Sequence, residues 1–270
     1  MLREICVTAT LAVMLAAPGL AQSRNQGFGR SSDTRCDDSW NDRRASHCEI
    51  REETISGLNP LDIDAGPNGG IRVRGWDRTD VLVRAKIVAQ ADTDAEARRL
   101  VAGVRVDAAG GRVRAEGPDN GRRESWSVSF ELQVPRAAIL ALNTKNGGIS
   151  IDDFRGVARF RAVNGGVSLS NVGGDVRGET TNGGLNLDLS GDRWDGPGLD
   201  VETSNGGVRL TLPAQYSATL ETGTINGGVN IDFPIALQGT IGRHITTTLG
   251  SGGAKVRAMT TNGGVTIRRR

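Results

Sequence analysis

Three aspartates in the second half of the chain recur in a pattern that could bind calcium. Each ends the sequence Gly-Gly-x-x-Φ-Asp, where Φ is aliphatic, and they are Asp152, Asp188 and Asp232. The calcium-binding nonapeptide is similar, Gly-Gly-x-Gly-x-Asp. The third glycine is absent here, and Ser170 and Thr211 occupy the corresponding aspartate positions of intervening units. A calcium-binding β-roll needs carboxylates on successive coils, so it is kept as an alternative and we predict no metal site.

Two of these aspartates could also form a catalytic pair. Asp152 and Asp188 are two repeats apart, and strand spacing would place them ~9–10 Å apart, near the upper limit for an inverting glycosidase. No insertion that could build a cleft surrounds them. The only histidines, His47 and His244, leave little from which to build a catalytic triad. We predict no catalytic residues, and a polysaccharide-degrading enzyme is the alternative.

One tryptophan lies in an irregular stretch between two repeats. Trp194 belongs to residues 191–198, an insertion that lengthens one repeat from 18 to 23 residues. An aromatic ring on a loop tip can contact a sugar or a protein partner. A ring folded back over the open edge of a coil would instead remove apolar area from water. Trp194 is therefore a candidate partner contact, and the structural role is left open.

Residues 1–21 have the features of a signal peptide. Arg3 gives a basic start, residues 5–17 are apolar apart from threonines, and Gly19 and Ala21 supply small residues for cleavage. The apolar run is too short to cross a bilayer, and no later run is long enough. We expect an exported protein, in the periplasm, on the outer surface or secreted, with no transmembrane span in the mature chain.

Two cysteines are left after removal of this segment. Disulfides persist in exported proteins, so we predict that Cys36 and Cys48 are bonded to each other. Residues 22–49 are rich in Ser, Asn, Asp, Arg and Gly, with little periodicity. They cannot bury enough apolar surface to fold alone. We expect a flexible leader that contains a disulfide loop.

Residues 50–135 have the alternation of antiparallel strands that bury one face. Ile71 and Val73 alternate with arginines, and residues 128–134 alternate in the same way before Pro135. Thr93 and Glu96 have the spacing of a capping box, and apolar residues follow at helical intervals. We predict an antiparallel β segment over 50–135 with a short helix near 93–102.

From residue 136 to residue 270 the chain repeats itself. The tripeptide Asn-Gly-Gly begins at Asn146, Asn164, Asn182, Asn205, Asn226 and Asn262. The intervals are 18, 18, 23, 21 and 36 residues, and the last equals two repeats, as if one turn had degenerated. Small or apolar residues precede each Asn at alternate positions, and aliphatic residues follow at the third and fifth positions. Each unit is therefore a strand, a corner and a second strand, with one face of both strands buried.

Two folds are compatible with these corners. Asn-Gly commonly forms a tight hairpin turn, which would fold each unit on itself. Corners at near-constant spacing can instead turn the chain around a β-solenoid, whose strands pair with the next coil. Identical inward residues in each unit favour a solenoid of about six to seven coils. The asparagines are then structural turns that can form a hydrogen-bonded ladder, and the glycines permit backbone angles closed to other residues.

These features together resemble the bacterial putative-adhesin β-strand-repeat family. The resemblance covers residues 50–268 and rests on Ile-Arg-Val-Arg-Gly-Trp-Asp at 71–77, the strand ending at Pro135 and the serial Asn-Gly-Gly units. It implies an exported all-β protein, an adhesin-like scaffold without catalytic residues or cofactors. The formal net charge of +2 is unfavourable for a nucleic-acid partner. We expect an unknown protein or glycan of the cell envelope as partner.

Overall fold

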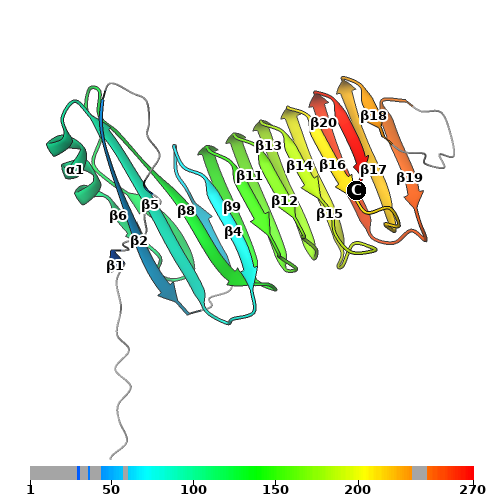
Figure 1. Cartoon of the computed structure of the whole chain (residues 1–270), viewed down its shortest axis with the longest axis horizontal. Helices are drawn as coiled ribbons and strands as arrows, with labels where there is room; N and C mark the ends of the chain where they lie inside the picture. Colours follow the sequence, from blue (N-terminus) through cyan, green and yellow to red (C-terminus); the bar gives the residue numbers. More distant parts are fainter. Residues whose placement is uncertain (1–28, 31–35, 37–43, 57–59, 233–241) are drawn as a thin grey trace, which may run out of the picture.

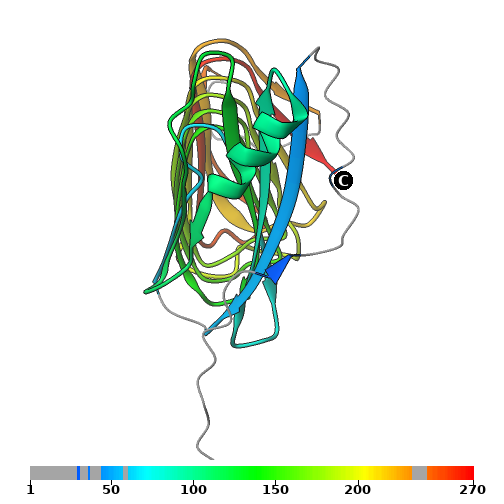
Figure 2. The same ribbon diagram turned by 90° about the vertical axis from the view of Figure 1, so that its left-hand side faces the viewer.

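The computed structural model describes residues 29–30, 36, 44–56, 60–232 and 242–270. The predicted signal peptide, residues 1–21, and much of the predicted leader lie outside the described residues. The described chain is all-β with one helix. Its strands form two large sheets, called sheet A and sheet B below, which face each other along an elongated molecule (Figures 1 and 2).

Sheet A has 11 strands in the spatial order β1-β2-β5-β8-β4-β10-β12-β14-β16-β21-β18. Their bounds are β1 Gly29–Arg30, β2 Ala45–Ile55, β5 Val81–Ala91, β8 Ser125–Pro135, β4 Ile71–Trp76, β10 Ile149–Asp152, β12 Val167–Ser170, β14 Leu185–Asp188, β16 Val208–Leu212, β21 Val265–Arg269 and β18 Val229–Ile231.

Sheet B has 10 strands in the spatial order β19-β17-β20-β15-β13-β11-β9-β3-β7-β6. Their bounds are β19 His244–Leu249, β17 Ala218–Asn226, β20 Lys255–Asn262, β15 Gly198–Asn205, β13 Asp175–Asn182, β11 Val157–Asn164, β9 Ile139–Asn146, β3 Leu61–Asp64, β7 Arg112–Glu116 and β6 Arg105–Asp107.

The repeats form a parallel β-solenoid. Each coil is a strand of sheet B, an Asn-Gly-Gly corner and a strand of sheet A, and each strand pairs in parallel with its equivalent in the next coil. For example, Asn164 is opposite Asn182 in the pairing of β11 with β13. The two strands that flank a corner belong to different sheets, so the corners are not hairpin turns.

The core lies between the two sheets and contains apolar residues from both sides of each corner, among them the aliphatic residues that follow it. Ile151, Leu169, Leu187 and Leu210 are completely buried. At the end of sheet A, by contrast, Val229 and Ile231 on β18 are only partly buried, because β18 is an edge strand with one neighbour, β21. Alternation along each strand therefore produces a mainly apolar interior and a mainly polar exterior.

The solenoid begins earlier in the chain than the repeat predicts. β3 pairs in parallel with β9, and β4 pairs in parallel with β10. These two strands flank Asn68, so residues within the predicted antiparallel segment form a solenoid coil. Between residues 45 and 135 the antiparallel pairings are those of β2 with β5 and of β5 with β8, which extend sheet A, and of β6 with β7, at the edge of sheet B.

The last coils do not follow the order of the sequence. β20 lies between β15 and β17, and β21 lies between β16 and β18. The interval of 36 residues is therefore not two successive coils with one degenerate corner. In sequence, the terminal coil of β17 and β18 comes first, and β19 follows, antiparallel to β17. β20 comes after them in sequence but lies between β15 and β17.

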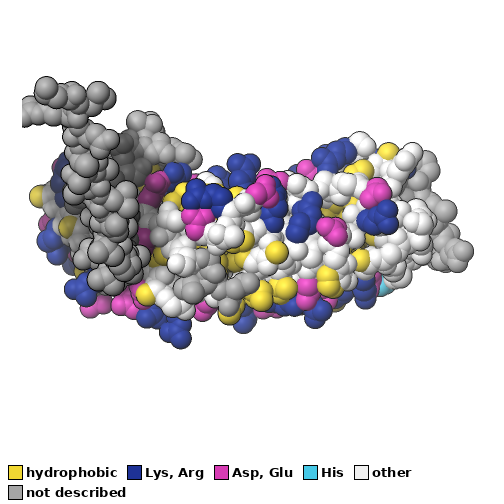
Figure 3. Space-filling view, turned by 90° about the horizontal axis from the view of Figure 1, so that it is seen from below, with side chains coloured by type: hydrophobic (Ala, Val, Ile, Leu, Met, Phe, Trp, Pro, Cys, Tyr) yellow, Lys and Arg dark blue, Asp and Glu magenta, His cyan; other side chains and the backbone are white. Residues whose placement is uncertain are grey.

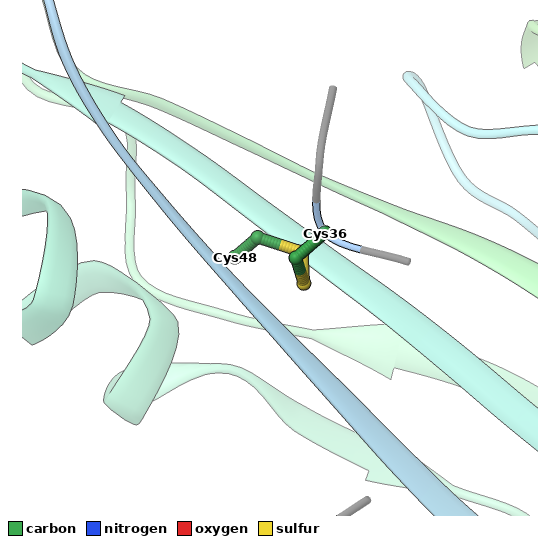
Figure 4. Close-up of a disulfide and its surroundings, with 2 residues drawn as sticks. All are labelled: Cys36 and Cys48. Atoms are coloured by element: carbon green, nitrogen blue, oxygen red, sulfur yellow. A yellow bond between two sulfur atoms is a disulfide. The ribbon is translucent and has the colours of Figure 1, made fainter. Parts of the chain in front are cut away.

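At the opposite end, α1 (Asp94–Gly103) packs against β2 and β5. The capping box is present, because the Thr93 hydroxyl accepts the Glu96 N–H and the Glu96 carboxylate accepts the Thr93 N–H. Cys36 and Cys48 form a disulfide that connects residue 36 to β2 (Figure 4).

Candidate functional site

The asparagines of the corners form a continuous ladder of hydrogen bonds. Each side-chain amide donates to the side-chain oxygen of the Asn in an adjacent coil, at distances of 2.7–3.1 Å. The spatial order of the ladder is Asn68, Asn146, Asn164, Asn182, Asn205, Asn262 and Asn226. The amides are therefore engaged with one another, which is a structural use.

The first glycine of a corner is needed for close stacking rather than for an unusual backbone angle. A Cβ added to Gly165 would lie 2.0 Å from the carbonyl oxygen of Gly147, and one added to Gly183 would lie 2.1 Å from that of Gly165. Neither glycine has a positive φ. The explanation from backbone freedom is thus wrong for these positions, because the constraint is contact between neighbouring coils.

Threonines lie two residues before five asparagines of the ladder, Asn146, Asn182, Asn205, Asn226 and Asn262. The hydroxyl of Thr180 donates to the carbonyl oxygen of Gly165 at 2.7 Å, and that of Thr203 donates to Gly183 at 2.7 Å. These threonines are buried, so the hydrogen bond satisfies a hydroxyl that would otherwise be costly to bury. Sequence reasoning treated this position only as a small inward residue.

Trp194 is covered by the fold. The side chain is only 4% exposed, and its indole N–H donates to the carbonyl oxygen of Gly174 at 2.9 Å. Trp194 therefore has the structural role, in which the ring is buried and its apolar area is removed from water. The interpretation of Trp194 as a candidate partner contact is corrected, because a buried ring cannot contact a partner.

The three repeated aspartates lie on the outer face of sheet A and are not gathered into one site. Asp188 pairs with Arg270 at 3.2 Å, and Asp232 pairs with Arg268 at 3.1 Å. Asp152 accepts a hydrogen bond from Ser150. β12 separates β10 from β14, and with them the carboxylates of Asp152 and Asp188. Within the described ranges, no three His, Cys, Asp or Glu side chains are grouped to hold a metal ion.

The outer face of sheet A displays side chains, all polar except Leu82, in two rows that cross the strands. The pairing register aligns the first row as Glu52, Arg84, Glu131, Arg72, Ser150, Ser168, Asn186, Arg209 and Thr266. It aligns the second row as Leu82, Gln133, Arg74, Asp152, Ser170, Asp188, Thr211 and Arg268. Neighbouring members of a row are about 4.8 Å apart, the spacing of strands.

A cavity of about 440 Å³ opens on this face where the antiparallel strands meet the solenoid. It is lined by Arg72, Arg74, Leu82, Arg84, Glu131, Leu132, Gln133, Ser150 and Asp152. The side chains of Arg72 and Arg74 are 66% and 67% exposed. We call this cavity, together with the two rows, the sheet A face.

The ion pairs around the cavity differ in how closely they engage the arginines. Arg84 donates to Glu52 of β2 and lies 3.6 Å from Glu131. Arg72 lies 3.7 Å from Glu131 and Arg74 lies 3.6 Å from Asp153, and both distances exceed a normal hydrogen bond. Arg72 and Arg74 therefore retain donors for a ligand.

Beyond the cavity, the end of β4 carries a second charged group. Arg136 donates to Asp77 at 2.7 Å, and this hydrogen bond holds the pKa of the Asp77 carboxyl below its ordinary value. The guanidinium of Arg78 lies 4.5 Å from the ring centre of Trp76 and hydrogen-bonds Asp80. That hydrogen bond likewise lowers the pKa of Asp80. Both acids stay ionised at neutral pH.

The sheet A face can recognise a ligand by hydrogen bonds and charge. Its carboxylates each have a hydroxyl or basic neighbour, and no histidine or cysteine lines the cavity. Sequence reasoning missed Arg72, Arg74 and Glu131 as a group. Alternation of Arg72 and Arg74 with buried residues predicts that they face outward, but only the pairing of β4 with β8 and β10 brings Glu131 and Ser150 beside them.

Fold and site together define a two-sheet β-solenoid whose sheet A has a largely polar outer face. The chain belongs to the Toastrack DUF4097 family, a domain family of unknown function, whose model matches residues 127–268. No curated protein was found to match the chain.

Solved structures with a similar arrangement include three bacterial proteins. A putative cell adhesion protein from Clostridium sporogenes is 11% identical, with a TM-score of 0.40 over 83% of this chain and 100% of its own. A putative adhesin from Bacteroides fragilis is 12% identical, with a TM-score of 0.36 over 82% and 97%. A putative lipid binding protein from Parabacteroides distasonis is 8% identical, with a TM-score of 0.32 over 81% and 96%.

The face of the molecule seen in Figure 3 carries both signs of charge. Seen from below, basic and acidic side chains alternate along the length of the molecule, with hydrophobic side chains between them (Figure 3). Nowhere in the described chain is there a helix with the length and apolarity that crossing a membrane requires.

Proposed function

We propose that the protein is an exported, non-catalytic interaction scaffold of the bacterial cell envelope, adhesin-like in its action, and that the sheet A face is its binding surface. The partner is a protein or glycan of the envelope. The signal-peptide features of residues 1–21 support export. The disulfide between Cys36 and Cys48 also supports an oxidising compartment.

The outer faces of the two sheets differ in how their arginines are paired. The sheet A face presents two rows of polar side chains at fixed spacing, and it includes arginines whose donors are not used by the fold. The outer face of sheet B differs over β11, β13, β15 and β20, because the arginines there pair closely with neighbouring acids. Arg159 donates to Asp175, and Arg257 donates to Asp200 at 2.6 Å. Rigid strands hold the sheet A face ready for a partner at little entropic cost.

Site-specific photo-crosslinking in the native envelope tests this proposal. A photoreactive amino acid at Ser168 samples the sheet A face, and one at Arg177 samples the outer face of sheet B as a matched control. We expect saturable capture from Ser168, which excess unlabelled protein abolishes, and little capture from Arg177. Equal capture from both positions, or none from Ser168, would overturn the choice of face.

Incubation with cell-wall and capsular polysaccharides tests the non-catalytic part. We expect no new reducing ends and no unsaturated products. Turnover that is lost in Asp152→Ala or Asp188→Ala would instead establish the glycosidase alternative.

A further inference from the structure

The centre of the sheet A face is a strip of short polar side chains. Ser150, Ser168 and Asn186 are aligned across β10, β12 and β14, and Ser170 lies in the adjacent row. Hydroxyl and amide groups both donate and accept hydrogen bonds, so such a strip can bind sugar hydroxyls. Its repeat of about 4.8 Å suits an extended chain of similar units more than a single compact ligand.

Arginines bound this strip on both sides. Arg72 is opposite Ser150 in the pairing of β4 with β10, and Arg209 is opposite Asn186 in the pairing of β14 with β16. Four strand spacings separate β4 from β16, which is about 19 Å. A ligand that reaches both sets of arginines is therefore several sugar residues long.

The flanking guanidinium groups are available to a ligand. Arg72 and Arg74 approach acids only at 3.7 and 3.6 Å and are mostly exposed. Arg209 is exposed, and no described residue forms a hydrogen bond or ion pair with it. Of the acids beside the strip, Asp188 pairs with Arg270, and Asp152 accepts a hydrogen bond from Ser150. Planar guanidinium groups bind carboxylate and sulfate by paired hydrogen bonds.

We infer that the sheet A face binds an acidic glycan, an extended chain of sugars that carry carboxylate or sulfate groups, lying across β4, β10, β12, β14 and β16. This inference rests on the proposed function and specifies its ligand. A protein partner fits less well, because the large exposed hydrophobic residues of the described chain, Ile139 and Ile225, lie on sheet B strands. Protein interfaces usually depend on buried aromatic or aliphatic anchors.

Binding of labelled hexasaccharides to the full-length exported protein tests the inference. The probes are a galacturonate hexasaccharide, a sulfated hexasaccharide and a neutral galactose hexasaccharide. We expect at least one acidic probe to bind about tenfold more tightly than the neutral probe, with affinity that falls as salt is added. Equal affinity for neutral and acidic probes would overturn the inference.

Charge-neutral variants locate the site. We expect Arg72→Gln with Arg74→Gln to weaken acidic binding about tenfold, and the matched pair Arg161→Gln with Arg177→Gln on sheet B to change it less than about twofold. Arg209→Gln should weaken the hexasaccharide but not a disaccharide, which cannot span both arginine sets. Thermal unfolding midpoints establish that each variant is folded.

Two outcomes separate this inference from the proposed function. If neither acidic probe binds while Ser168 still captures a partner, the acidic glycan is wrong and the binding face stands. If Ser168 captures nothing, the proposed function fails. Equal weakening by the sheet B pair would show that binding is nonspecific attraction to positive charge, which also overturns the inference.

Discussion

Single residues in this solenoid are constrained by the coil beside them. The first glycine of a corner has no room for a side chain, because the carbonyl of the neighbouring coil lies where its Cβ would be. The buried ring of Phe160 likewise occupies the space beside Gly178, the residue opposite it on the next strand. A mutation therefore disturbs a pair of coils, in keeping with the nearest-neighbour energetics of repeat proteins.

At Gly165 we predict that substitution by alanine destabilises two coils. The new methyl group would lie 2.0 Å from the Gly147 oxygen, so the coils must separate and lose hydrogen bonds. We expect a loss of about 2–4 kcal/mol in the free energy of unfolding, measured by denaturant melts. The control is Gly264→Ala, whose Cβ would meet its nearest atom at an ordinary 3.6 Å. Equal losses in the two variants would contradict the stacking explanation.

We predict that Phe160→Ala and Gly178→Ala each reduce the free energy of unfolding, and that combining them partly restores it. Phe160→Ala removes a buried ring and should cost about 3–5 kcal/mol. Gly178→Ala places a methyl group 2.3 Å from a ring carbon and should cost about 1–3 kcal/mol. In the double variant the clash is gone, so the combined loss should be smaller than the sum.

The control for this cycle is the opposite face of the same strand. Arg159→Ala and Arg161→Ala remove exposed ion pairs, with Asp175 and Glu179, and should change stability by less than about 0.5 kcal/mol. Losses as large as that of Phe160→Ala would mean that the inward and outward assignment of β11 is incorrect.

Elements are joined across the terminal coils by a charged cluster. Glu221 on β17 pairs with Lys255 on β20, and it lies 3.6 Å from Arg257 and 3.8 Å from His244 on β19. The hydrogen bond from Lys255 is the main cause that lowers the pKa of Glu221 from its ordinary value of 4.5. The carboxylate therefore connects three strands of sheet B in its ionised form.

We predict that this cluster contributes a specific acid sensitivity. Because the folded state lowers the Glu221 pKa, its contribution to stability is present above pH 4.5 and is lost as pH falls through the lowered pKa. Denaturant melts at pH 7 and at acid pH should show a smaller loss of stability in Glu221→Gln than in the unmodified protein. Glu116→Gln, at a side chain that is 73% exposed on β7, is the control and should leave the loss unchanged.

At the scale of the whole molecule, the spatial order of the last coils differs from their order in the sequence. β20 and β21, the last strands of the chain, lie between the coil of β15 and β16 and the coil of β17 and β18. The Asn ladder follows the same order, with Asn262 between Asn205 and Asn226. The coil of β17 and β18 is therefore hydrogen-bonded to the coil of β15 and β16 only through β20 and β21, the last two strands of the sequence.

Deletion of residues 255–270 tests this dependence. We predict that the truncated protein loses amide exchange protection in β17 and β18, which precede the deletion in sequence, while β11 and β13 keep theirs. The control is the replacement of Cys36 and Cys48 by serine, which removes a disulfide worth about 2–3 kcal/mol at the opposite end of the molecule. This variant should keep the exchange protection of β17 and β18. Retained protection in β17 after the deletion would contradict the inserted arrangement.

Features that depend on residues close together in the sequence could be predicted, and features that depend on distant residues could not. Alternation around each corner predicts the all-β class and the inward faces, because side-chain direction along a strand has a fixed period. The near-constant spacing of the corners predicts the Asn ladder, because it stacks each Asn on the next. The capping box of α1 is equally local. The candidate binding face was not predictable, because Arg72 and Ser150 meet only through the pairing of β4 with β10.

By itself, therefore, the sequence determined a repeating coil with an apolar inside, a glycine-rich corner and a polar outside. Tertiary structure alone decided which coils are neighbours. Asn68 joins the ladder although it lies 78 residues before Asn146, and Asn262 lies beside Asn205 rather than beyond Asn226. All coils carry nearly the same pairing groups, so the repeat does not encode their order. The connections between coils, and the burial that each arrangement achieves, decide it.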